Sequence, residues 1–144
     1  MERRKFIKTC GYTTIGIPLL TGVLQSCTSF YYATSSRKEN KLIVAESEFL
    51  KDENSTERPF VLIKTKEDEF PICLYKIENG HYVASLLKCT HQGCELNIGG
   101  GIYSCPCHGS EFSTMGKVLE GPAETDLKTY KIETDDENIY IFLS

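Results

Sequence analysis

Two short clusters of cysteine and histidine constrain this chain of 144 residues more than any other feature of its sequence. The first cluster reads Cys-Thr-His-Gln-Gly-Cys over 89–94, and the second reads Cys-Pro-Cys-His-Gly-Ser-Glu-Phe over 105–112. Each cluster offers two cysteines and one histidine within six residues. Thiolates and imidazoles bind zinc and iron, and paired thiols form disulfides, so the pattern indicates a metal site, a disulfide, or both.

Simpler explanations of the two clusters account for only part of the pattern. A structural zinc takes four ligands in a tetrahedron, so the six candidates here leave two cysteines without a role. A scheme with disulfides alone leaves both histidines unexplained. A thioredoxin-like site needs Cys-x-x-Cys at the start of a helix, whereas a single residue separates Cys105 from Cys107.

The clusters resemble the motifs of Rieske iron–sulfur proteins of the high-potential, disulfide-bearing type, as in quinol–cytochrome c reductase or the arsenite oxidase small subunit. In that family, Cys-x-His and Cys-x-x-His pairs from two loops hold a two-iron cluster. The resemblance implies one [2Fe-2S] cluster per chain, with Cys89 and Cys105 as ligands of the inner iron. The outer iron would then be held by His91 and His108. Neutral imidazoles leave the cluster less negative than four thiolates do, which raises its reduction potential.

The resemblance extends to residues around the implied cluster. It implies a disulfide between Cys94 and Cys107 that ties the two loops together, and a Ser110 hydroxyl that hydrogen-bonds a bridging sulfide. Phe112 stands where many quinol-oxidising members have Tyr, so we predict a lower reduction potential than in those members. Gln92 stands where quinol-oxidising relatives usually have Leu, which makes the tip of the first loop more polar.

Beyond residue 40 the chain reads as short strands separated by turns. Apolar or alternating runs without helical periodicity lie at 41–49, 59–65, 70–77, 81–87, 102–104, 118–119, 129–132 and 138–143. They predict an all-β fold, a Rieske-type antiparallel β-sandwich or barrel over 41–144. Cys, His, Gly and Pro concentrate over about 85–123, which predicts a small cluster-binding subdomain inserted between strands. Cys73 falls in one of the runs and is predicted to be a small buried core residue.

The amino-terminal part of the chain has the layout of an export segment. Arg3-Arg4-Lys5-Phe6-Ile7-Lys8 resembles the twin-arginine motif, and Leu24-Gln25-Ser26-Cys27 resembles a lipobox. We predict an export signal over 1–27 that ends at a lipidated Cys27; the alternatives are an uncleaved membrane anchor and a buried helix. Residues 28–40, rich in Ser, Thr and Tyr, are predicted to form a flexible tether.

Charge and motif content exclude several classes of function. Lys and Arg number 16 against 20 Asp and Glu, which gives a net charge of -4 at pH 7. Nucleic acid binding requires clustered Lys and Arg, so no nucleic acid partner is expected. The sequence shows neither a nucleophile–base signature nor a phosphate-binding loop, so no catalytic residues are predicted. The family resemblance therefore implies an electron-transfer subunit of an oxidoreductase complex rather than a free-standing enzyme.

The resemblance and the export segment together predict a membrane-tethered electron-transfer protein in the bacterial cell envelope, on the periplasmic side of the inner membrane. The implied role is the iron–sulfur subunit of a quinol-oxidising cytochrome complex, with cytochrome b- and c-type subunits as redox partners and quinol as an electron source. A second interpretation is the small subunit of a periplasmic molybdenum oxidase of the arsenite oxidase type, partnered by the large subunit. A structural zinc protein is the third.

Overall fold

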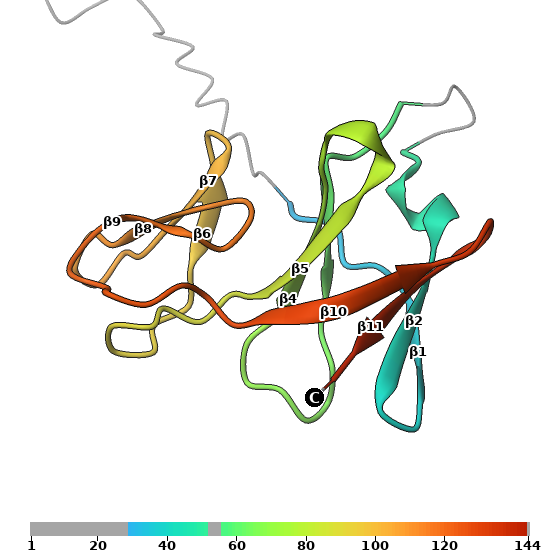
Figure 1. Cartoon of the computed structure of the whole chain (residues 1–144), viewed down its shortest axis with the longest axis horizontal. Helices are drawn as coiled ribbons and strands as arrows, with labels where there is room; N and C mark the ends of the chain where they lie inside the picture. The colour runs from blue at the N-terminus through green and yellow to red at the C-terminus, as the bar shows by residue number, and fades with distance from the viewer. Residues whose placement is uncertain (1–28, 52–55, 144) are drawn as a thin grey trace, which may run out of the picture.

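The computed structural model describes residues 29–51 and 56–143, which form two antiparallel sheets (Figure 1). The export segment predicted over 1–27, including Cys27, lies outside the described residues. In the part of the chain that the structure describes, no helix is both long enough and apolar enough to cross a membrane. The helical segments there are the short 3-10 turns η1 (Glu46–Phe49) and η2 (Glu78–Gly80). The predicted all-β fold is confirmed.

The larger sheet contains seven strands in the order β1-β2-β11-β10-β5-β4-β3, with all neighbours antiparallel. They are β1 (Ser35–Lys38), β2 (Lys41–Ala45), β3 (Phe60–Ile63), β4 (Ile72–Lys76), β5 (Tyr82–Leu86), β10 (Thr129–Thr134) and β11 (Asn138–Phe142). Period-two alternation gives the sheet a buried face: Leu42 and Val44 of β2 are buried, as are Ile139 and Ile141 of β11. These side chains contribute to the first of two apolar cores.

The smaller sheet contains β6 (Asn97–Gly99), β7 (Ile102–Ser104), β8 (Glu111–Ser113) and β9 (Val118–Glu120), paired in that order. It is inserted between β5 and β10, which pair with each other in the larger sheet. The chain therefore leaves the larger sheet and returns to it at adjacent strands, and the smaller sheet stands to one side (Figure 1). This arrangement confirms the predicted insertion of a small subdomain between strands.

A second apolar core includes side chains from both sheets. Cys73 of β4, Tyr103 of β7 and Phe112 of β8 belong to it and are fully buried. Burial raises the pKa of the Cys73 thiol to about 12, although a hydrogen bond with the Tyr103 side chain acts in the opposite direction. A thiol that stays protonated is a poor nucleophile and a poor metal ligand, so Cys73 is a core residue, as predicted.

The structure differs from the sequence-based expectation over 28–40. Strand β1 pairs with β2 along its length, and Tyr32 forms a parallel bridge with Leu62. The Ser-Ser-Arg-Lys sequence of β1 has no apolar alternation, so the usual sequence signal for a strand is missing. It forms because its backbone groups pair with the edge of β2. Much of the predicted tether therefore belongs to the folded domain.

Candidate metal centre

Two loops with the same backbone hydrogen bonds carry the cysteine and histidine clusters. In the first loop, the N–H of Cys89 donates to the carbonyl of Cys94 (2.8 Å), and the N–H of Gly93 donates to the carbonyl of Cys89 (2.9 Å). In the second loop, Cys105 donates to Ser110 (2.8 Å), and Gly109 donates to Cys105 (3.1 Å). Each loop thus folds back on its first cysteine. The sequence places this cysteine, a histidine and a glycine at nearly the same spacing in both loops.

A glycine closes each loop in the left-handed backbone region. Gly93 has φ 77° and Gly109 has φ 82°, values that L side chains adopt only with strain. A Cβ on Gly93 would also lie 3.2 Å from the Lys88 side chain. Glycine at these positions lets both loops turn tightly around their cysteines.

The first cysteine of each loop is a free, buried thiol. Cys89 is 2 % exposed and Cys105 is 4 % exposed. Burial alone would raise the pKa of the Cys105 thiol, but hydrogen bonds from the backbone N–H of Cys107, the Cys89 thiol and the backbone N–H of His108 together lower it below its ordinary value. Backbone dipoles that favour a buried thiolate prepare this sulfur to bind a metal.

The two imidazoles lie next to each other on the solvent side of the thiols. The ring centroids of His91 and His108 are 5.0 Å apart, with the ring planes at 88°. His108 is exposed and His91 is half-buried. The Nδ1 atom of His91 is buried and has no hydrogen-bond partner within the described residues. Since a buried polar atom normally has a partner, this nitrogen has the chemistry and the position of a metal ligand.

The donor atoms form two pairs rather than one quartet. Among the described residues, the one group of three or more ligand atoms within 4.8 Å of one another comprises Cys94, Cys105 and Cys107. Two of those sulfurs are joined in a disulfide and are not free to bind. A tetrahedral zinc needs four free atoms within about 4 Å of one another, because its bonds are about 2.0–2.3 Å long. A thiol pair beside an imidazole pair fits a two-iron cluster better than a single zinc.

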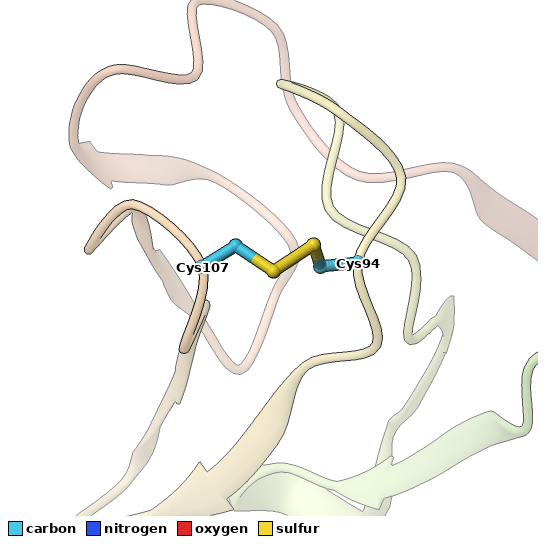
Figure 2. Close-up of a disulfide and its surroundings, with 2 residues drawn as sticks. All are labelled: Cys94 and Cys107. Atoms are coloured by element: carbon cyan, nitrogen blue, oxygen red, sulfur yellow. A yellow bond between two sulfur atoms is a disulfide. The ribbon is translucent and has the colours of Figure 1, made fainter.

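A disulfide joins the two loops. Cys94 and Cys107 are bonded, with their Cα atoms 6.6 Å apart, and Figure 2 shows the bond spanning from one loop to the other. The pairing that the family resemblance implied is confirmed. Because the bond joins the loops covalently, it limits how far the thiol and imidazole pairs can move apart.

A third segment, which follows β9, is bonded to both loops. The buried Ser110 hydroxyl oxygen accepts a hydrogen bond from the N–H of Ala123 (3.0 Å), and the Thr90 hydroxyl donates to the carbonyl of Thr125 (2.6 Å). The Ser110 hydroxyl keeps its own proton for another acceptor. The bond from Thr90 has no sequence signal, because a threonine between two ligand-type residues does not indicate a partner 35 residues away.

Two buried thiols and a pair of imidazoles, one half-buried and one exposed, lie in two disulfide-linked loops on a small all-β insertion. This donor set is typical of one class of protein, the electron carriers with a mixed thiolate and imidazole iron–sulfur centre. Comparison with known proteins gives the family. Residues 40–131 match the Rieske [2Fe-2S] domain, so well over half of the chain is included. The chain belongs to the Rieske family.

Individual relatives agree with this assignment. The chain is 27% identical over 152 aligned positions to the cytochrome b6-f complex iron–sulfur subunit of Synechococcus sp. (strain JA-3-3Ab), covering 96% of this chain and 86% of that protein. A shorter match to a subunit of the same name from Prochlorococcus marinus is 46% identical over 55 residues and spans 37% of this chain and 31% of that protein. The crystal structure of the cyanobacterial plasma membrane Rieske protein PetC3 from Synechocystis PCC 6803 matches with TM-score 0.51 and 36% identity. This last match covers 58% of this chain and 85% of that one.

The chain is therefore a Rieske iron–sulfur electron-transfer protein, and its domain binds a [2Fe-2S] cluster. The unpaired Nδ1 of His91, the buried thiols of Cys89 and Cys105 and the exposed imidazole of His108 fit such a cluster. The family match thus confirms the [2Fe-2S] cluster as the cofactor of this domain, as the sequence predicted.

Proposed function

We propose that this chain is the iron–sulfur subunit of a quinol-oxidising cytochrome complex and that it relays one electron at a time. The observation that carries the proposal is the match to a cytochrome b6-f complex iron–sulfur subunit over 96% of this chain and 86% of that protein. Similarity over nearly the whole length of both chains includes the region before the domain. It supports a similar architecture rather than a shared metal motif alone.

We further propose the ligand set of the cluster: Cys89 and Cys105 on one iron, and His91 and His108 on the other. The burial of both thiols, the unpaired Nδ1 of His91 and the contact between the imidazole rings support this assignment. When bound, the cluster supplies a one-electron redox centre. The residues around it exclude water from the thiols and leave the imidazole of His108 at the surface, where a redox partner can approach.

The electron count defines the partners that the protein requires. Oxidation of a quinol to a quinone releases two electrons and two protons, and a single [2Fe-2S] cluster accepts one electron. The second electron must pass to another acceptor, which we propose is a cytochrome b-type subunit. The reduced cluster would then pass its electron to a c-type cytochrome.

The proposed location is the periplasmic side of a bacterial inner membrane, with the chain held there by its amino-terminal segment. The twin-arginine-like run and the lipobox-like sequence before Cys27 support this location from the sequence. A relative described as a plasma membrane Rieske protein gives independent support. We propose that residues 1–27 are the export or anchoring segment. The folded domain begins a few residues after it.

Purification of the tagged full chain from its native membrane tests the proposed complex. We expect cytochrome b- and c-type subunits to co-purify, and we expect deletion of the chain to abolish quinol-dependent reduction of the c-type cytochrome in those membranes. Recovery of a molybdenum-containing large subunit in place of the cytochromes would contradict the proposal. That result would support the second candidate, the small subunit of a molybdenum oxidase.

A specific feature favours this second candidate. Gln92 is exposed at the tip of the first loop, beside the ligand candidate His91. The groove next to His91 has a volume of about 700 Å³, and its lining includes Gln92 and the charged residues Lys88, Lys128 and Glu69, with Phe70 and Leu86 as its large apolar residues. A polar tip flanked by lysines suits an aqueous protein partner better than an apolar quinone pocket.

Removal of the Ser110 hydroxyl is expected to lower the reduction potential. In Ser110→Ala the reduced, more negative cluster loses a hydrogen-bond donor worth about 1 kcal/mol, which corresponds to roughly 45 mV for a one-electron couple. Ser113→Ala is the matched control, since the Ser113 hydroxyl also accepts a backbone N–H bond (3.2 Å from Lys117 N) but lies at the far end of β8. Redox titration should show a lower potential for the first variant alone. Equal potentials in both variants and the wild type would contradict the role of Ser110.

A further inference from the structure

The segment Phe30–Ala33, here called the arm, is fixed along the outer edge of β3. The N–H of Ala33 donates to the carbonyl of Leu62 (2.8 Å), and the N–H of Leu62 donates to the carbonyl of Tyr31 (2.9 Å). This is the pattern of a short parallel bridge at the sheet edge. The arm lies next to the start of the described residues, so the folded domain begins within a few residues of Cys27.

Side-chain contacts also hold the arm in place. The Arg58 guanidinium lies over the Tyr31 ring, 3.9 Å from its centroid, and the Tyr31 hydroxyl donates a 2.7 Å hydrogen bond to Glu48. The rings of Phe30 and Phe60 pack with their centroids 6.0 Å apart. Arg58 in turn donates to the carbonyl of Leu50, which connects the arm to the segment after η1.

Most of the exposed apolar side chains gather around this arm. Within the described residues, six large apolar side chains are strongly exposed. Three of them belong to the arm, namely Phe30 (41%), Tyr31 (40%) and Tyr32 (49%), and Leu50 (45%) lies in the segment that Arg58 joins to it; we call these four the arm patch. Charged residues adjoin it: Lys51 follows Leu50, Arg58 covers the Tyr31 ring, and the Glu48 carboxylate accepts the hydrogen bond from the Tyr31 hydroxyl. Exposed aromatic rings bordered by Lys and Arg are typical of surfaces that sit at a membrane–water interface.

We infer that the arm patch rests on the surface of the lipid bilayer. The inference depends on the proposed membrane tether and adds the face by which the domain contacts the membrane. Cys27 precedes Phe30 by three residues, which span at most about 11 Å. The stretch 9–36 has no charged residue. No charged side chain between the proposed anchor and the arm patch would therefore have to be kept out of the bilayer. Lys51 and Arg58 complement anionic headgroups.

This orientation places the cluster loops away from the membrane. A groove of about 420 Å³ beside the arm is also lined by the Gly99–Gly101 turn between β6 and β7. That turn is at one end of the β6–β7 hairpin, and the loops 89–94 and 105–110 are at the other end. With the arm patch on the bilayer, the exposed His108 faces a partner in the aqueous phase. The cluster loops could reach quinol in the membrane only after the domain rotates relative to the bilayer.

Single-tryptophan reporters test the inference, since the natural chain contains no Trp. Leu50→Trp places the reporter in the arm patch, 23 residues from Cys27 in sequence, and Leu119→Trp is the matched control, a leucine of similar exposure (54%) in the cluster subdomain. The full holo-protein is mixed with phosphatidylethanolamine–phosphatidylglycerol vesicles that carry brominated acyl chains. We expect quenching of at least about two-fold and a blue shift for the Leu50→Trp reporter, because interfacial groups insert about 5–10 Å. The Leu119→Trp reporter should change little.

Flotation of the same samples separates the possible failures. Vesicle-bound protein with an unquenched Leu50→Trp reporter, or with stronger quenching at Leu119→Trp, would overturn the inference and leave the tether intact. Self-association through the arm patch without quenching would overturn it too. Protein that does not float with the vesicles would overturn both the inference and the proposed tether.

Discussion

Cys105→Ser is expected to abolish cluster binding and leave a folded, colourless chain. The Cys105 thiol is 4 % exposed, and hydrogen bonds from the backbone N–H groups of Cys107 and His108 favour its thiolate. A serine hydroxyl stays protonated at neutral pH and cannot replace the thiolate as an iron ligand. Iron content and visible absorption should both fall to roughly a tenth of the wild-type values or less, since one of four ligands is lost.

Cys73→Ser is the control for this prediction. Cys73 is also a free, fully buried thiol, and it lies in the same apolar core as Cys105, but it is on β4 and outside both loops. This variant should keep full iron content while losing a little stability, because a hydroxyl replaces a thiol in the core. Iron retained in Cys105→Ser, or lost equally in both variants, would contradict the ligand assignment.

Removal of the disulfide is expected to cost the domain about 3 kcal/mol in its free energy of unfolding. Cys94 and Cys107 are separated by 13 residues, and a cross-link that closes a loop of this size restricts the unfolded chain by about that amount. The double variant Cys94→Ala/Cys107→Ala also frees the two loops from each other, so cluster loss should accelerate. Denaturant unfolding of the full chain, followed by circular dichroism and by visible absorption, measures both effects.

A reductant provides the control for the disulfide prediction. Dithiothreitol should shift the unfolding midpoint of the wild type towards that of the double variant and should leave the double variant unchanged. Equal midpoints for the wild type and the double variant under non-reducing conditions would show that the cross-link does not stabilise the domain.

The site was more predictable from the sequence than the sheet that supports it. The ligand candidates, Ser110 and the disulfide pair fall within two short motifs whose residue types and spacing are specific. The two loops have the same conformation because each is held by hydrogen bonds between residues four or five positions apart, so a short stretch of sequence is enough to predict it. The hydrogen bond that Thr90 donates to Thr125 and the one that Ser110 accepts from Ala123 link residues 35 and 13 positions apart, and no local pattern encodes them.

The strands that escaped prediction lack a period-two apolar pattern. Strand β1 is polar and forms by pairing with an edge, and β6 and β8 are three-residue strands next to the glycine turn and the second loop. The run expected over 41–49 ends as a strand at Ala45 and continues as the turn η1, in which Phe49 is buried. A single apolar run thus forms a strand followed by a 3-10 turn, and both place side chains in the first apolar core.

Metal analysis and electron paramagnetic resonance of the reduced full chain test the central claim most directly. We predict two iron atoms per chain and a rhombic signal, as expected for a [2Fe-2S] cluster held by two thiolates and two imidazoles. One zinc per chain, no iron after anaerobic reconstitution and no rhombic signal would contradict the account.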